Sequence, residues 1–210
     1  MLPWIALTAG STLALLASER AGLRAGVWLA KPLAASGFVA AALAAGALHA
    51  SYGRWILAGL ALSWLGDLLL VPRDARLPFL AGLVSFLLGH VAYTLAFAVR
   101  GLDLVTCLVA AAAVLGASLL ALRWLLPHVP ARMRTPVLAY MVVISAMLVC
   151  AAGTVGHAGR PAIFAGAFAF YLSDLAVARE RFVAKSFRNK LWGLPLYFGA
   201  QLVLASTVAP

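Results

Sequence analysis

The chain carries little charge, very few acidic residues and few cysteines. Of its 210 residues, 16 are Lys or Arg and only six are Asp or Glu, together 10%, whereas 65% are hydrophobic. A soluble domain has about 25% charged and 45–50% apolar residues. This composition excludes an ordinary soluble fold, a disordered chain and a coiled coil. The only cysteines, Cys107 and Cys150, lie in apolar runs, which excludes a disulfide scaffold.

The long apolar runs instead predict a polytopic membrane protein. A helix that crosses the hydrocarbon core needs about 20 mostly apolar residues. Eight such stretches occur, at about 3–18, 32–49, 55–71, 77–98, 104–126, 136–152, 161–178 and 190–208. Strand alternation is missing, and lipid leaves no backbone group unpaired, so the spans are expected to be helices. The first stretch has no basic segment before it, which favours a helix over a signal peptide. We predict an all-α bundle, residues 1–210 forming one transmembrane domain.

The basic residues predict the orientation of this bundle. Only Arg54, Arg100 and Arg160 fall in the even connections, and the other 13 fall in the odd ones: Arg20, Arg24, Lys31, Arg73, Arg76, Arg123, Arg132, Arg134, Arg179, Arg181, Lys185, Arg188 and Lys190. Cytoplasmic loops retain positive residues. The odd connections should therefore be cytoplasmic and both termini non-cytoplasmic, as in a bacterial inner (plasma) membrane protein. The net charge of +10 then reflects topology and anionic lipid, and no basic soluble domain exists to bind nucleic acid.

Two four-residue segments hint at an internal repeat. Leu65-Gly66-Asp67-Leu68 resembles Leu172-Ser173-Asp174-Leu175 at an offset of 107 residues, and the same offset carries His90 onto Tyr197. A parallel four-plus-four duplication would produce this match and would place the two aspartates at equal depth. A match this short is also compatible with chance.

Two of the six acidic residues lie inside predicted spans. A carboxylate in a membrane helix costs about 2.5–3.5 kcal/mol on insertion scales, so such residues usually face the bundle interior. Asp67 and Asp174 both follow long apolar stretches and are expected in the cytoplasmic third of the membrane, whereas the others lie at loops or span ends as solvated or interfacial charges: Glu19, Asp74, Asp103 and Glu180. The pair could be structural, each acid locking the bundle through a Lys, Arg or Tyr, or it could form an acid/base couple.

Other polar residues share helical faces that could look at this pair. Ser63 and Asp67 are separated by four residues, as are Tyr197 and Gln201, and Tyr171 and Asp174 are separated by three. Tyr140 lies one turn into the sixth span, and the fourth span carries a stripe: Gly82, Phe86, His90, Tyr93 and Phe97.

Lys31 and His90 mark the two expected ends of such a site. Lys31, directly before Pro32, is expected to open the second span, either as a snorkelling residue or as a ligand contact. His90 is expected about 20 Å from the cytoplasmic end, at 1.5 Å per residue, deeper than the aspartates. It is the only intramembrane histidine, so no metal site is predicted.

Six motifs in order resemble the lysoplasmalogenase family of polytopic membrane proteins, the YhhN-like family. They extend over essentially the whole chain: Lys31-Pro32-Leu33, Leu65-Gly66-Asp67-Leu68-Leu69-Leu70, Gly82 to Tyr93, Tyr140 to Met147, Gly166 to Asp174, and Tyr197-Phe198-Gly199-Ala200-Gln201. The clearest departure is Tyr171, where an aliphatic residue is commoner in the family.

This resemblance implies a cofactor-free ether hydrolase. Such an enzyme uses water to cleave the vinyl ether bond of a lysoplasmalogen, a 1-alkenyl glycerophosphoethanolamine or glycerophosphocholine, and releases a fatty aldehyde. Asp67 and Asp174 would be the catalytic pair, and the substrate-binding residues would be Lys31, His90, Tyr93, Tyr140, Tyr171, Tyr197 and Gln201. The expected partners are a lysophospholipid substrate and the bilayer.

Two alternatives come from other functional classes. In a small proton-coupled transporter of lipids or solutes, the aspartates would carry protons, since repeats and intramembrane carboxylates are usual there. A non-catalytic structural bundle would need no ligand cavity near the aspartates. The sequence leaves open the exact lipid and the oligomeric state.

Overall fold

A computed structural model describes residues 1–72, 76–158 and 161–208. Within these residues the chain forms eight α-helices and no strand: α1 (Leu2–Ala21), α2 (Arg24–Ala44), α3 (Ser51–Leu69), α4 (Arg76–Arg100), α5 (Leu104–Leu125), α6 (Ala131–Ala158), α7 (Pro161–Ala178) and α8 (Phe187–Ser206). A 3₁₀ turn, η1 (Leu126–His128), follows α5, and a π-helical turn, η2 (Arg179–Val183), follows α7. The predicted all-helical class is confirmed for the described residues.

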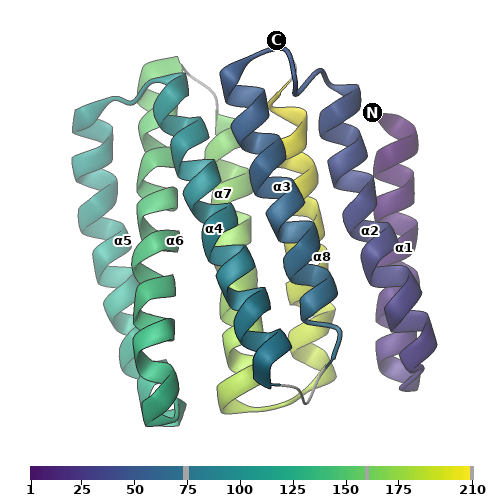
Figure 1. Ribbon diagram of the computed structural model, residues 1–210. Coiled ribbons are helices and arrows are strands. Elements are labelled where there is room, and N and C mark those ends of the chain that lie inside the picture. Colours follow the sequence, from purple (N-terminus) through teal and green to yellow (C-terminus); the bar gives the residue numbers. More distant parts are fainter. Residues whose placement is uncertain (73–75, 159–160, 209–210) are drawn as a thin grey trace.

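The helices form one bundle in which successive helices run in opposite directions (Figure 1). Both termini lie at the same end, at the top of Figure 1, as an even number of crossings requires. In the described part of the chain, five segments are long and apolar enough to cross a membrane: Arg24–Ala44, Arg76–Arg100, Leu104–His128, Ala131–Gly156 and Pro161–Val183. The count of eight spans and the outward termini stay predictions, and the expected loop positions of Arg73, Asp74 and Arg160 lie outside the described residues.

The second helix begins earlier than the sequence suggests. Lys31 and Pro32 do not open it, because α2 starts at Arg24, and Ser18 to Arg20 belong to the last turn of α1 rather than to the connection. The chain reverses within two residues, since Gly22 ends α1 in the left-handed conformation at φ 70°. Pro is common at the first helical position, which misled the prediction. Membrane helices also tolerate Pro in their interior, where neighbouring groups satisfy the freed backbone.

The first four helices pack against one another much as the last four do. The offset of 107 residues carries α3 onto α7 and α4 onto α8 within a few residues at each end. Packing is reciprocal as well, since α2 lies on α3 as α6 lies on α7, and α4 lies on α6 as α8 lies on α2. The α1–α2 and α5–α6 pairs occupy opposite sides of the bundle (Figure 1). This arrangement agrees with the repeat hypothesis, while a duplication in the history of the chain stays a prediction.

Rings and small residues fill the middle of the bundle. The largest fully buried side chains include Tyr93, Phe38, Phe97, Phe170 and Phe198. Helices α3 and α4 approach closely because Gly59 and Gly66 leave room for two rings of α4, and a methyl group at either glycine would overlap the ring of Tyr93 or Phe86. The Phe86 ring that this packing admits lies 5.8 Å from the Tyr197 ring, measured between centroids.

Candidate functional site

Asp67, near the end of α3, is held by groups from two other helices. Its carboxylate is 3% exposed, and the Lys31 ammonium of α2 lies 3.1 Å from Oδ1. The same ammonium donates to the Asp67 backbone carbonyl at 3.2 Å. The Tyr197 hydroxyl of α8 donates to Oδ2 at 2.6 Å. Both carboxylate oxygens therefore have a partner, and one partner is a full positive charge.

Asp174, near the end of α7, also draws its partners from two other helices. The Tyr140 hydroxyl of α6 donates to Oδ2 at 2.9 Å. The His90 Nε2 atom of α4 lies 3.4 Å from the same oxygen, and the Asp174 side chain is 18% exposed whereas that of His90 is fully buried. Asp174 is thus the more accessible acid, and Tyr140 and His90 both approach its Oδ2 atom.

A single phenylalanine connects the two surroundings. The Phe170 ring of α7 lies 4.4 Å from the His90 ring and 5.4 Å from the Tyr197 ring, measured between centroids. The Phe86 ring closes the group at 6.3 Å from Phe170 and 5.8 Å from Tyr197. His90 beside Asp174 and Tyr197 beside Asp67 therefore pack around one aromatic core.

The partners are exchanged between the two halves of the chain. Asp67 receives its phenol from α8, and Asp174 receives its imidazole from α4. Under the offset of 107 residues, Asp67 corresponds to Asp174 and Tyr197 corresponds to His90. Each half therefore completes the surroundings of the acid in the other half, as a two-fold relation between the halves requires.

Tyr93 and Gln201 form a third polar pair in the bundle interior. The Tyr93 hydroxyl donates to Gln201 Oε1 at 2.6 Å, and both residues are fully buried. Gln201 lies one helical turn beyond Tyr197 on α8, so this pair continues the polar face that begins at Asp67.

Tyr171 points elsewhere. Its hydroxyl lies 3.0 Å from Ser118 Oγ of α5, which in turn lies 2.8 Å from Ser145 Oγ of α6. Tyr171 is the one predicted site residue, of nine, whose hydroxyl contacts this serine cluster. Although Tyr171 precedes Asp174 by only three residues, its hydroxyl contacts Ser118 rather than the Asp174 carboxylate.

The four remaining acidic residues differ from this pair. Asp103 caps α5 by accepting from the Thr106 backbone N–H at 2.7 Å. Glu19 binds Lys190 at 2.7 Å, and Glu180 accepts from Asn189 at 2.8 Å. These three sit at helix ends, as expected, and the fourth, Asp74, is outside the described residues.

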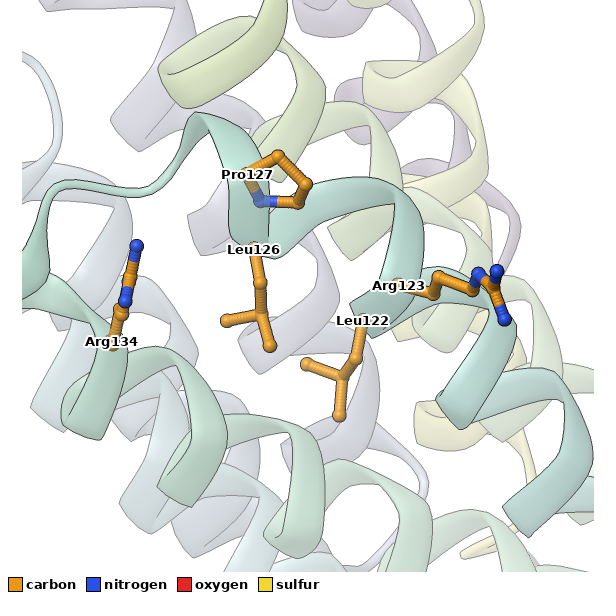
Figure 2. A pocket seen from close by; sticks show the side chains of 5 residues that line it. All are labelled: Leu122, Arg123, Leu126, Pro127 and Arg134. Atoms are coloured by element: carbon orange, nitrogen blue, oxygen red, sulfur yellow. The ribbon is translucent and has the colours of Figure 1, made fainter.

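A surface hollow lies away from the two acids. It is found where α5 turns into α6, and Figure 2 shows Arg123 and Arg134 around an apolar floor. Leu122, Leu126 and Pro127 complete its lining. A second, apolar hollow lies between α3 and α4, lined by Leu62, Leu65, Leu69, Leu77, Leu80, Ala81, Val84, Ser85 and Leu88. Among the described residues, no aspartate lines either hollow.

Sequence reasoning missed Phe170 as a central residue and missed the contact between Lys31 and Asp67. Phe170 precedes Asp174 by four residues, so helical spacing places it on the same face. Its apolar side chain in an apolar helix gave no other signal. Lys31 contacts Asp67 because α2 begins early, which places Lys31 within the helix rather than at its start.

Comparison with protein families identifies the chain. The model described as the YhhN family matches residues 26–208, nearly the whole chain. No curated protein and no solved structure matches it. The chain therefore belongs to the YhhN family, the lysoplasmalogenase family, and its long apolar helices make it an integral membrane protein.

Proposed function

We propose that this YhhN-family protein is a lysoplasmalogenase-type ether hydrolase. It would cleave the vinyl ether bond of a 1-alkenyl glycerophosphoethanolamine or glycerophosphocholine with water. The products are a fatty aldehyde and the glycerophospho-base. The observation that carries the proposal, beside family membership, is the pair of interior carboxylates, Asp67 and Asp174, whose partners pack around one aromatic core.

The chemistry of a vinyl ether suits two carboxyl groups. A proton adds to the alkene carbon that is not bonded to oxygen, and the π electrons form the new C–H bond, leaving an oxocarbenium ion. Water then adds to the cationic carbon and loses a proton, and the hemiacetal collapses to aldehyde and alcohol. A general acid supplies the first proton, and a carboxylate stabilises the cation, as at a glycosidic centre with its oxocarbenium-like transition state.

The remaining predicted residues would surround the lipid. Tyr140, Tyr197 and Gln201 offer hydroxyl and amide groups that can orient water or the glycerol oxygens. His90 does not lie deeper than both acids, because its Nε2 atom is 3.4 Å from Asp174 Oδ2. Tyr93, one turn further along α4, would border the alkenyl chain. Lys31 would interact with the phosphate through its partly exposed ammonium, 13% of the side chain being accessible. Tyr171 would act only from a distance, since its hydroxyl binds Ser118.

The assay is release of fatty aldehyde by the purified protein in detergent micelles. We expect the parent to hydrolyse 1-alkenyl glycerophosphoethanolamine but not its 1-acyl counterpart. Asp67→Asn and Asp174→Asn should each lower kcat by at least about 10²-fold, the scale of general acid–base catalysis.

Asp103→Asn is the matched control, because Asp103 lies at the start of α5, where it caps the helix, and Asn is an equally good cap. Its activity should equal that of the parent. Parent-like turnover in both Asn variants of the interior pair would exclude the catalytic assignment and leave the structural interpretation of the two acids.

A proton-coupled transporter is the second candidate, and the exchanged halves favour it. Many transporters are built from repeats related by an axis in or along the membrane, with their site at the repeat interface. Proteoliposomes with an acidic exterior distinguish the two candidates. Lipid or solute uptake driven by the proton gradient, without aldehyde release, would support transport, whereas aldehyde release without a gradient supports hydrolysis.

A further inference from the structure

The contacts of His90 fix where its protons lie. The Nδ1 atom is 2.6 Å from the Phe86 backbone carbonyl, one turn earlier on α4. A carbonyl oxygen can only accept a hydrogen bond, so Nδ1 must carry a hydrogen and donate it. In a neutral imidazole the other nitrogen, Nε2, then presents a lone pair.

Among the described residues Nε2 has no hydrogen-bond partner, and the polar group beside it is a carboxyl. Nε2 lies 3.4 Å from Asp174 Oδ2, and the imidazole is fully buried. A bare lone pair and a bare carboxylate would repel each other in this poorly solvated interior. The contact becomes attractive if one more proton is present, either on Nε2, giving an imidazolium beside a carboxylate, or on Asp174, whose O–H then donates to Nε2.

The other groups that contact His90 and Asp174 do not replace this additional proton. Tyr140 of α6 packs its ring 5.3 Å from the imidazole and donates its hydroxyl to Asp174. The Phe170 ring of α7 covers the imidazole at 4.4 Å. Across residues 1–72, 76–158 and 161–208, no Lys or Arg side chain forms an ion pair with Asp174. A phenol donates a hydrogen bond but brings no net charge.

Asp67 needs no such proton. Lys31 supplies a positive charge at 3.1 Å from Oδ1, and Tyr197 donates to Oδ2. With both oxygens occupied by donors, its ionised form is the satisfied one. The two acids therefore differ in their contacts, since Asp67 pairs with an ammonium and a phenol, whereas Asp174 contacts a phenol and an imidazole.

We propose that the His90–Asp174 pair stores one transferable proton and that Asp174 is the general acid, with Asp67 as the fixed anion. The storage of the proton stands on geometry alone, and the role of Asp174 rests on the proposed ether hydrolysis. In the first step the Asp174 O–H bond breaks and a C–H bond forms at the alkene carbon. The water that adds to the oxocarbenium ion returns one proton to Asp174. His90 is a positioning residue that keeps this proton on the pair.

Spectroscopy tests the storage of the proton without any substrate. ¹⁵N NMR of labelled histidine, with His90→Gln to assign the signal, reports both ring nitrogens at neutral pH. Infrared spectra with labelled aspartate report protonated carboxyl groups. We expect either an imidazolium at His90 or a protonated Asp174, and we expect Asp174→Asn to abolish that signature.

Asp103→Asn is the matched control, since it changes an aspartate at the start of α5 and leaves the His90–Asp174 signature in place. A neutral His90 together with an ionised Asp174 would overturn the proposal, whatever the protein catalyses.

Kinetics then test the roles. We expect His90→Gln to lower kcat by about 10²-fold with little change in KM, because a positioning residue acts on the proton-transfer step. A loss confined to KM would overturn the assigned role of His90. If the parent releases no aldehyde, the proposed function fails, while the spectra still decide whether the pair holds a proton.

Discussion

Asp67 and Asp174 occupy corresponding places in the two halves of the bundle, yet their neighbours differ in charge. Each acid receives groups from a helix of its own half and from a helix of the other half. Around Asp67 these groups are an ammonium and a phenol, and around Asp174 they are a phenol and an imidazole. The comparison shows that one helical framework gives its two interior acids different partners, an ammonium at Asp67 and an imidazole at Asp174.

The largest difference between the halves should appear when the cation is removed. Lys31→Met leaves the Asp67 carboxylate, 3% exposed, without its positive charge. Breaking a buried ion pair on one side costs about 3–5 kcal/mol. We expect the free energy of unfolding in detergent to fall by an amount near that range.

Two companion variants sharpen this test. Adding Asp67→Asn to Lys31→Met should recover most of the loss, because no charge is then left unpaired. The exposed Lys185→Met should change stability by less than about 0.5 kcal/mol. An equal loss for Lys31→Met and Lys185→Met would contradict a buried ion pair at Asp67.

A second test compares corresponding glycines, Gly59 of α3 and Gly166 of α7. A Cβ atom at Gly59 would overlap the rigid Tyr93 ring, whereas one at Gly166 would meet the end of the flexible Leu204 side chain. Overpacking costs about 1–3 kcal/mol, and we expect Gly59→Ala to lie at the upper end and Gly166→Ala at the lower end. Thermal unfolding measures both, with Gly199→Ala as the control because its Cβ meets nothing within 4 Å. Equal losses would show that the two helix contacts are equally adaptable, and the reverse order would show that Leu204 yields less than the Tyr93 ring.

The smallest expected difference concerns the two phenols. Tyr197→Phe removes a 2.6 Å hydrogen bond to the buried Asp67, and Tyr140→Phe removes a 2.9 Å bond to the more accessible Asp174. Interhelical hydrogen bonds in membranes contribute about 0.6–1.7 kcal/mol. We expect Tyr197→Phe to lower the free energy of unfolding more than Tyr140→Phe does, as measured by chemical unfolding. Equal losses would show that the difference in burial between Asp67 and Asp174 does not affect the strength of these hydrogen bonds.

The sequence predicts the outline of this fold because its signals are local. Runs of about 20 apolar residues mark helices wherever they occur, and the bounds of α7 agree with the predicted stretch at both ends. The start of α2 was missed because Pro32 resembles a helix start, although a membrane helix can continue through it.

The sequence identifies candidate residues one at a time, but it does not show which of them contact each other. The insertion cost of a carboxylate singles out Asp67 and Asp174 without any structure. Which partner faces which acid depends on how α2, α4, α6 and α8 converge, and residues separated by 130 positions, such as Asp67 and Tyr197, leave no local pattern. Tyr171 shows the same limit, since spacing along α7 could not reveal that Ser118 of α5 lies within its reach.

The exchange of partners between the halves has a consequence for biosynthesis. Lys31 precedes Asp67 along the chain, and His90 precedes Asp174, so each acid emerges from the ribosome after its nitrogen-bearing neighbour. A carboxylate entering the bilayer alone would meet the full insertion penalty. In both cases this order makes the nitrogen-bearing side chain available before the acid. Helix α8 then delivers the Tyr197 hydroxyl to Asp67, so the surroundings of Asp67 are completed only after 130 further residues have been made.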